Sequence, residues 1–263
     1  MRLSAGRTII GAAVLMAGIL GLNRTSTVAA DPLSDAEFKA LFDQDVKNIM
    51  PMIEKGASGK KAEISKASRS VKSNAMMIAF YANSRIGGKN ATEDLKMAAL
   101  RDTALIVALD SGKKNFKAAA VPAAKLSLDI AVNKGEAKAM DVADLSKKAE
   151  LDIEELMYQF KKIEVGGLGI EKEIKDNAKK PALNADKMSA LATRVLIVAD
   201  YSEEVHVAFD AKKTKKAWDG FNKDMRTAAI DLKKAAEVKD KKKLQAAFDK
   251  LDRSCTACHE VMK

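Results

Sequence analysis

Apolar residues recur at three- and four-residue spacing through most of this chain, in stretches that glycines and polar residues interrupt. Ile153, Leu156 and Phe160 follow this spacing, which places their side chains on one face of a helix. Only 4 of the 263 residues are proline and only 5% are aromatic, a composition that favours helices over strands. The sequence therefore predicts an all-α fold.

Eight helices are expected, four on each side of a polar segment, residues 135–140, that predicts a linker. The first four are expected near residues 34–56, 60–85, 92–110 and 113–133. The second four are expected near residues 141–165, 186–209, 213–238 and 240–263, with a long loop over 166–182. Pro51 and Pro122 are expected to kink or end their helices early, because proline lacks the backbone N–H.

The two sets of four helices resemble each other. Met76-Met77-Ile78-Ala79-x-Tyr81 in the first set matches Leu196-Ile197-Val198-Ala199-x-Tyr201 in the second, and three other matches keep the same order along the chain. An internal duplication explains that order. We therefore predict two tandem up-down four-helix bundles, residues 31–134 and 141–263.

Residues 1–30 have the pattern of a secretory signal peptide. Arg2 and Arg7 form a basic start, Ile9 to Leu22 is an uncharged apolar run, and Val28-Ala29-Ala30 is typical of a cleavage site. We expect cleavage after Ala30 and export to a periplasm, with an uncleaved N-terminal anchor as the alternative. The apolar run is too short for a transmembrane helix, and no transmembrane segment is expected in the mature chain.

One short segment, Cys255-Thr256-Ala257-Cys258-His259, contains both cysteines of the chain and one of its two histidines. Cys-x-x-Cys-His is the attachment sequence of a c-type haem: the thiols of Cys255 and Cys258 bind the haem covalently, and His259 binds its iron as the proximal ligand. A redox-active Cys-x-x-Cys and half of a zinc site are the alternatives.

The first half lacks this segment. Ser127, Ile130 and Ala131 stand at the positions that match Cys255, Cys258 and His259 in the repeat. We therefore expect one covalently attached haem c per chain and a haem-free first half. The prediction of export and the prediction of haem attachment support each other, since covalent attachment takes place outside the bacterial cytoplasm.

Residues 141–263 resemble the cytochrome c-prime family. The resemblance is carried by Ala217-Trp218-x-x-Phe221, by the haem segment with Lys263 four residues after its histidine, and by Met157 followed by Val165-Gly166-Gly167. Ile153 stands where family members often have an arginine. The resemblance implies an up-down four-helix bundle with its haem on the last helix, and dimerisation through the first two helices. The fused first half could occupy that dimer surface and form an internal pseudo-dimer, or the protein could be a homodimer.

The sixth coordination position of the iron distinguishes the possible functions. In the family this position usually faces an apolar residue, so that NO or CO can bind; a methionine there favours electron transfer. Met157 is the candidate sixth ligand, but Met50 holds the equivalent place in the haem-free half, where no iron requires it.

The sequence therefore predicts a periplasmic monohaem c-type cytochrome that acts in electron transfer with other periplasmic redox proteins. The alternatives are a five-coordinate haem protein that binds small gases, and an interaction or sensor protein that uses its haem-free half for docking. An enzyme is not expected. Nucleic acid is not an expected partner despite the net charge of +10, because the lysines are scattered. Residues 239–243 are either a solvated helix start or a docking patch for an acidic partner.

Overall fold

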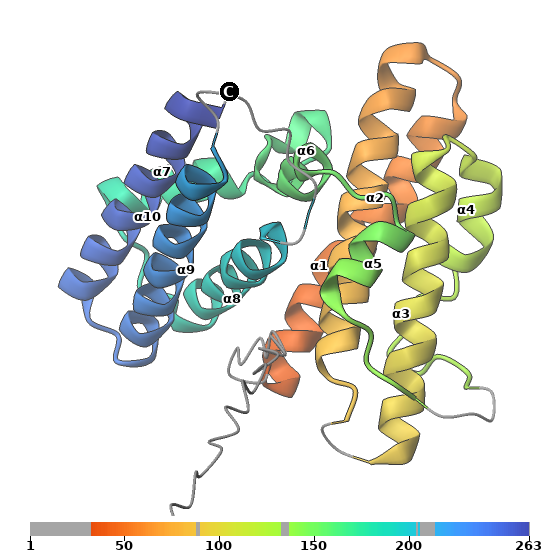
Figure 1. Cartoon of the computed structure of the whole chain (residues 1–263), viewed down its shortest axis with the longest axis horizontal. Coiled ribbons are helices and arrows are strands. Elements are labelled where there is room, and N and C mark those ends of the chain that lie inside the picture. Colours follow the sequence, from red (N-terminus) through yellow and green to blue (C-terminus); the bar gives the residue numbers. More distant parts are fainter. Residues whose placement is uncertain (1–32, 88–89, 133–136, 204, 206–213, 263) are drawn as a thin grey trace, which may run out of the picture.

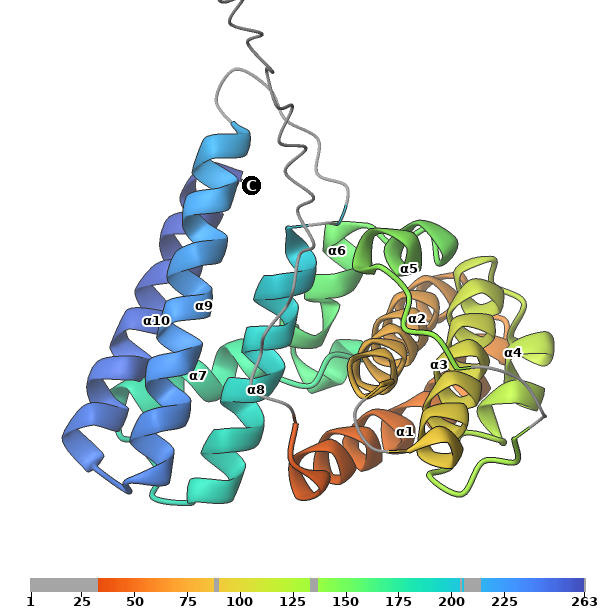
Figure 2. The same cartoon turned by 60° about the horizontal axis from the view of Figure 1, so that its bottom comes forward.

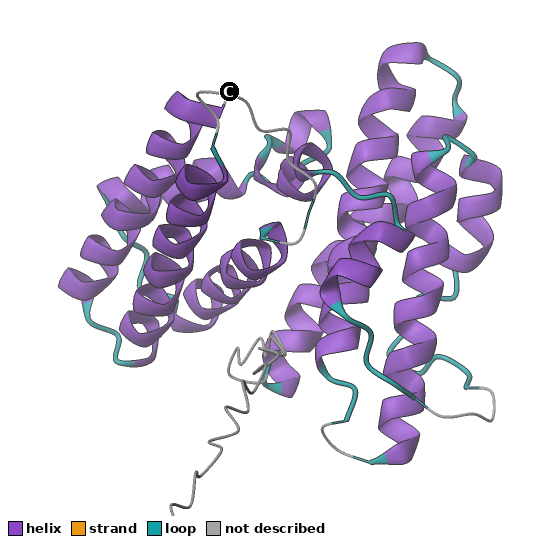
Figure 3. Ribbon diagram, in the orientation of Figure 1, coloured by secondary structure: helices purple, strands orange, loops and turns teal. Residues whose placement is uncertain are grey.

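The computed structural model describes residues 33–87, 90–132, 137–203, 205 and 214–262. Every regular element in this part of the chain is helical (Figure 3), with ten α-helices and two short 3-10 helices. The all-α prediction is therefore confirmed. The expected signal peptide and the first residues of the expected linker lie outside the described residues. None of the described helices combines the length and apolar character needed to cross a membrane.

The first half forms a four-helix bundle. It contains α1 (Asp35–Ala57), α2 (Lys61–Ser84), α3 (Ala91–Gly112) and α4 (Phe116–Ala123). Each helix packs against the next, and α4 packs against α1 to close the ring (Figure 1). α2 is the central helix, because every residue from Ser70 to Asn83 is buried. Such burial on all sides explains why α2 lacks a continuous polar face.

α4 is much shorter than the predicted helix over residues 113–133. It ends at Ala123, one residue after Pro122, which confirms the early end expected there. Pro51 has no such effect, because α1 continues through it to Ala57. Ser127 and Ile130, which match the two cysteines in the repeat, consequently lie in turns beyond the helix.

The prediction of a single helix over residues 141–165 is wrong. The segment instead forms α5 (Val142–Lys148), α6 (Ile153–Leu156), η1 (Met157–Phe160) and η2 (Ile163–Val165). Glu150 has a φ of 50°, and Asp152 begins α6 through a capping box with Glu155. An N-cap residue adopts an extended backbone, so this capping box interrupts any helix that arrives from α5.

The second half contains α7 (Ile170–Lys179), α8 (Ala185–Ser202), α9 (Lys215–Glu237) and α10 (Lys241–Met262). α7 lies within residues 166–182, where a loop was predicted, so that prediction is wrong. α8 packs against α9, α9 against α10, and α10 against α7. Figure 2 shows α8 between the α9–α10 pair and the first half.

Reciprocal contacts join the two halves: α1 packs against α8, and α2 packs against α6 and η1. At the centre, the buried guanidinium of Arg194 lies 2.8 Å from Asp45, and Gln159 is hydrogen-bonded to both. The Tyr201 ring stacks on Phe80 with 3.6 Å between centroids. The buried apolar side chains of both halves form one continuous cluster.

Candidate functional site

The candidate site lies on the last three turns of α10. The buried face of this helix passes through Leu244, Phe248 and Leu251, at spacings of four and three residues. Cys255 and Cys258 continue that spacing, and both side chains are half-buried. The intervening Thr256 and Ala257 are exposed on the other side of the helix. The helix therefore directs both thiols towards the interior of the second half.

His259 follows Cys255 by one helical turn, so the two side chains are neighbours on the helix surface. Its imidazole is exposed. It also lies in the last turn of α10, where a protonated imidazole favourably meets the negative end of the helix dipole.

α7 lies beside the thiols. Burial, with Asp252, Cys258 and Glu171, raises the pKa of Cys255 to about 12, against the opposing charge of Lys175. Burial also raises the pKa of Cys258. Both groups are therefore thiols and not thiolates at neutral pH. A redox-active Cys-x-x-Cys depends on a thiol with a lowered pKa, so this environment disfavours the redox interpretation.

The helix beside the thiols, α7, was not predicted from the sequence, although its pattern of buried residues is present there. Ile170, Ile174 and Asn177 are the buried residues of α7 and recur at helical spacing. Gly169 precedes them with a φ of 74° and begins the helix. The surrounding glycines and the proline at Pro181 obscured this pattern.

Met157 lies at the junction of α6 and η1, not on a long first helix of the second half. Its segment packs against α2 and α7. Met157 is partly buried against the common apolar cluster, and so is Met50, its counterpart in the first half. Its assignment as an iron ligand stays a prediction.

The residues present fit a c-type haem. Two unpaired thiols, three residues apart on an inward face, and a histidine next to the second thiol are the donor set that this group needs. Among the described residues no group of three or more His, Cys, Asp and Glu side chains is placed to hold a metal ion; His206, the other histidine, lies outside them.

Comparison with known proteins found no matching family model, no matching curated protein and no matching solved structure. The resemblance to cytochrome c-prime therefore depends on the quoted residues alone.

Proposed function

We propose that the protein carries one covalently attached haem c, held by Cys255, Cys258 and His259, and acts in electron transfer in the periplasm. One observation carries the proposal: the only Cys-x-x-Cys-His of the chain lies on a single helix whose buried face continues through both thiols. A cofactor site built in this way resembles those in other helical bundles, where side chains on facing helices hold the group.

The chain's own residues would hold the group and limit its access to water. α10 fixes the three donors, because they occupy neighbouring turns of one continuous helix. α7 covers the thiols, and α9 supports α10 along its length. Trp218 fixes α9 against α8 by donating its indole N–H to the carbonyl of Ser202 at 3.1 Å. When bound, the haem iron would supply a one-electron change of oxidation state.

A second function is favoured by the position of Met157. Met157 is partly buried against the common apolar cluster, as Met50 is in the haem-free half, so its burial is that of an ordinary core side chain. An iron without a sixth protein ligand binds small gases such as NO or CO. The docking or sensor role predicted for the haem-free half is a further alternative.

One feature of the fold and one of the sequence support the associated proposals. In a two-fold dimer, the first helix of each subunit contacts the second helix of the other. The packing of α1 on α8, and of α2 on α6 and η1, has this reciprocal form and is what an internal pseudo-dimer would have. We therefore propose a monomer in which the first half replaces a second subunit. Periplasmic localisation is proposed from the signal-peptide pattern of residues 1–30.

The test is to express the chain in a bacterium with a periplasmic haem-attachment system and record the pyridine haemochrome spectrum. We expect a thioether-linked haem at one per chain that resists extraction into acidified organic solvent. Extractable haem, or none, would contradict the proposal. Cys255→Ala with Cys258→Ala should abolish attachment. Ser127→Ala with Ile130→Ala, at the matching positions of the first half, is the control and should leave haem attachment unchanged.

The absorption spectrum of the reduced protein also separates the two functions. Low-spin bands and no reaction with CO indicate a sixth protein ligand and electron transfer. A high-spin spectrum that changes on adding CO indicates a gas-binding site.

A further inference from the structure

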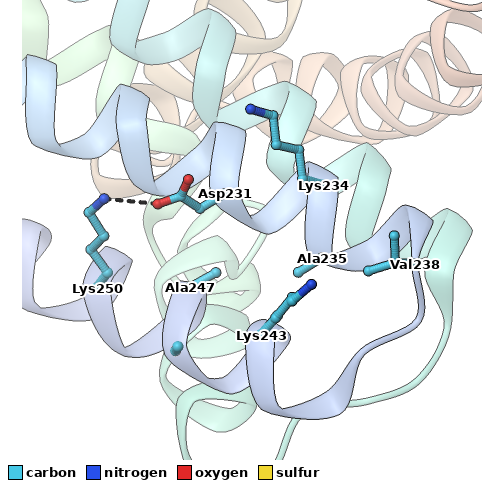
Figure 4. A pocket seen from close by; sticks show the side chains of 8 residues that line it. Asp231, Lys234, Ala235, Val238, Lys243, Ala247 and Lys250 are labelled. Carbon is cyan, nitrogen blue, oxygen red and sulfur yellow. Dashed lines mark hydrogen bonds and ion pairs between the residues drawn. The ribbon is translucent and has the colours of Figure 1, made fainter.

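A groove runs between α9 and α10, close to the turn that joins them (Figure 4). Ala235, Ala246 and Ala247 line it, and Val238 is 61% exposed beside them. Lys234 and Lys243 lie on its two edges. The groove thus has a small apolar centre and a cationic rim, the arrangement found in protein–protein interfaces.

The carboxylates near the groove are already engaged. Asp231 is paired with Lys250 at 2.9 Å, as the dashed line in Figure 4 shows. Asp240 accepts hydrogen bonds from the backbone N–H groups of Lys242 and Lys243 at the start of α10. Asp240 also lies 3.9 Å from the ammonium group of Lys243 and offsets part of its charge. The exposed Lys234, Lys239, Lys241 and Lys242 still outnumber the two other carboxylates of this region, Glu237 and Asp249.

The net charge of this region is positive. Between positions 231 and 250 the chain has seven lysines and four carboxylates. Lys239, on the turn next to the groove, and Lys241 and Lys242, in the first turn of α10, are exposed. Cations distributed over two helices and their turn are too widely spread for one small anion, so the complementary ligand is an extended acidic surface.

The groove and the candidate haem site share α10. Lys250 precedes Cys255 by five residues, which corresponds to about 7.5 Å of helix. Lys243 precedes Cys255 by twelve residues, about 18 Å of helix, so a protein docked over the groove would cover the start of α10, the end opposite the thiols.

We propose that the groove between α9 and α10 is the docking surface for an acidic partner protein, whose carboxylates pair with Lys234, Lys243 and the lysines of the adjoining turn while an apolar side chain packs on Val238. That this partner is an electron donor or acceptor rests on the proposed function; the docking itself does not.

The test uses the full chain and a purified acidic flavodoxin as the probe, with binding measured by calorimetry at low and high salt. Lys234→Glu with Lys243→Glu should weaken binding at low salt by about tenfold or more, because each reversal adds repulsion at the rim. Lys234→Gln with Lys243→Gln should weaken it less. Val238→Ser should weaken it by about threefold, since little apolar area is lost.

Lys113→Glu with Lys117→Glu is the matched control. These lysines are also exposed, and they stand at the end of α3 and in the first turn of α4, as Lys234 and Lys243 stand at the end of α9 and the start of α10. Equal weakening in both double variants would mean a response to net charge alone and would overturn the proposal. No measurable binding by the wild-type chain would overturn it as well.

Two further measurements distinguish a failure of docking from a failure of haem attachment, and a protein partner from a lipid surface. The Cys255→Ala, Cys258→Ala chain should bind the probe as the wild type does, so docking is judged even where haem attachment fails. Confirmed haem attachment without lysine-dependent binding would overturn the docking alone. Lysine-dependent binding to phosphatidylglycerol vesicles, with none to the flavodoxin, would assign the groove to a lipid surface and overturn the proposal.

Discussion

At the scale of single residues, the candidate site depends on how α10 orients its side chains. A spacing of three between Cys255 and Cys258 and of four between Cys255 and His259 places all three on adjoining turns, and the sequence alone predicts this. The burial of the thiols depends on α7, so it could not be predicted while residues 166–182 were expected to form a loop. The charges of Glu171 and Lys175 beside Cys255 were missed for the same reason.

Met157 and Met50 form a matched pair for testing ligation. Both are partly buried against the same apolar cluster, so Met157→Ala and Met50→Ala should each lower the free energy of unfolding by about 1–3 kcal/mol. We expect the haem spectrum of the Met157→Ala protein to match that of the Met50→Ala protein. A shift to high spin in the Met157 variant only would identify its sulfur as the sixth ligand.

Asp45 should make stability depend on pH. Burial raises the pKa of Asp45 from 3.8 to about 6, although Arg194 and Gln159 oppose that rise. The folded protein therefore binds this proton more tightly than the unfolded chain between these values, so the contribution of Asp45 to stability is largest below pH 3.8 and falls as pH rises to about 6.

Asp45→Asn removes that contribution. The difference in unfolding free energy between wild type and variant, measured by urea denaturation, should decrease by roughly 3 kcal/mol across this interval. A difference that stays constant, or that increases with pH, would show that Asp45 does not titrate in this way.

At the scale of helices, the sequence correctly predicts the long helices with a regular apolar face. It does not predict the boundaries of short helices that follow one another closely. α1, α2, α9 and α10 begin and end within about two residues of expectation, because their periodicity extends over many turns. The segment from α5 to η2 has the sequence pattern of one amphipathic helix. The capping box at Asp152 and the left-handed backbone of Glu150 divide it into shorter elements. Its packing against α2, far away in sequence, has no local signal.

Two helical glycines should respond oppositely to the same substitution. A Cβ at Gly56, near the end of α1, would lie 2.4 Å from the ring of Phe116 in α4, whereas a Cβ at Gly220, within α9, would meet nothing within 4 Å. Gly56→Ala should therefore destabilise the protein by about 1–3 kcal/mol. Gly220→Ala should stabilise it by about 0.5–1 kcal/mol, because alanine restricts the unfolded chain and favours helix. Thermal unfolding measures both, and a stabilised Gly56→Ala protein would show that α4 does not pack against α1.

At the scale of the whole molecule, the two halves share one core. The repeat predicts two similar bundles, but similarity of sequence does not predict how copies pack. Here the Arg194–Asp45 pair and the stacked rings of Phe80 and Tyr201 connect helices from both halves, and the apolar cluster is continuous between them. Removing one partner of a buried ion pair leaves a charge without compensation, so the halves have little freedom to separate.

The shared core predicts that the chain unfolds as one cooperative unit. Trp218 is the only tryptophan and is buried in the second half, so its fluorescence reports on that half, whereas far-UV circular dichroism reports on all helices. In the haem-free Cys255→Ala, Cys258→Ala chain, both signals should change at the same denaturant concentration. Adding Gly56→Ala, a change confined to the first half, should shift the fluorescence transition to lower denaturant by the same amount as the dichroism transition. If only the dichroism transition moves, the halves unfold separately, and the contacts between α1 and α8 contribute little to stability.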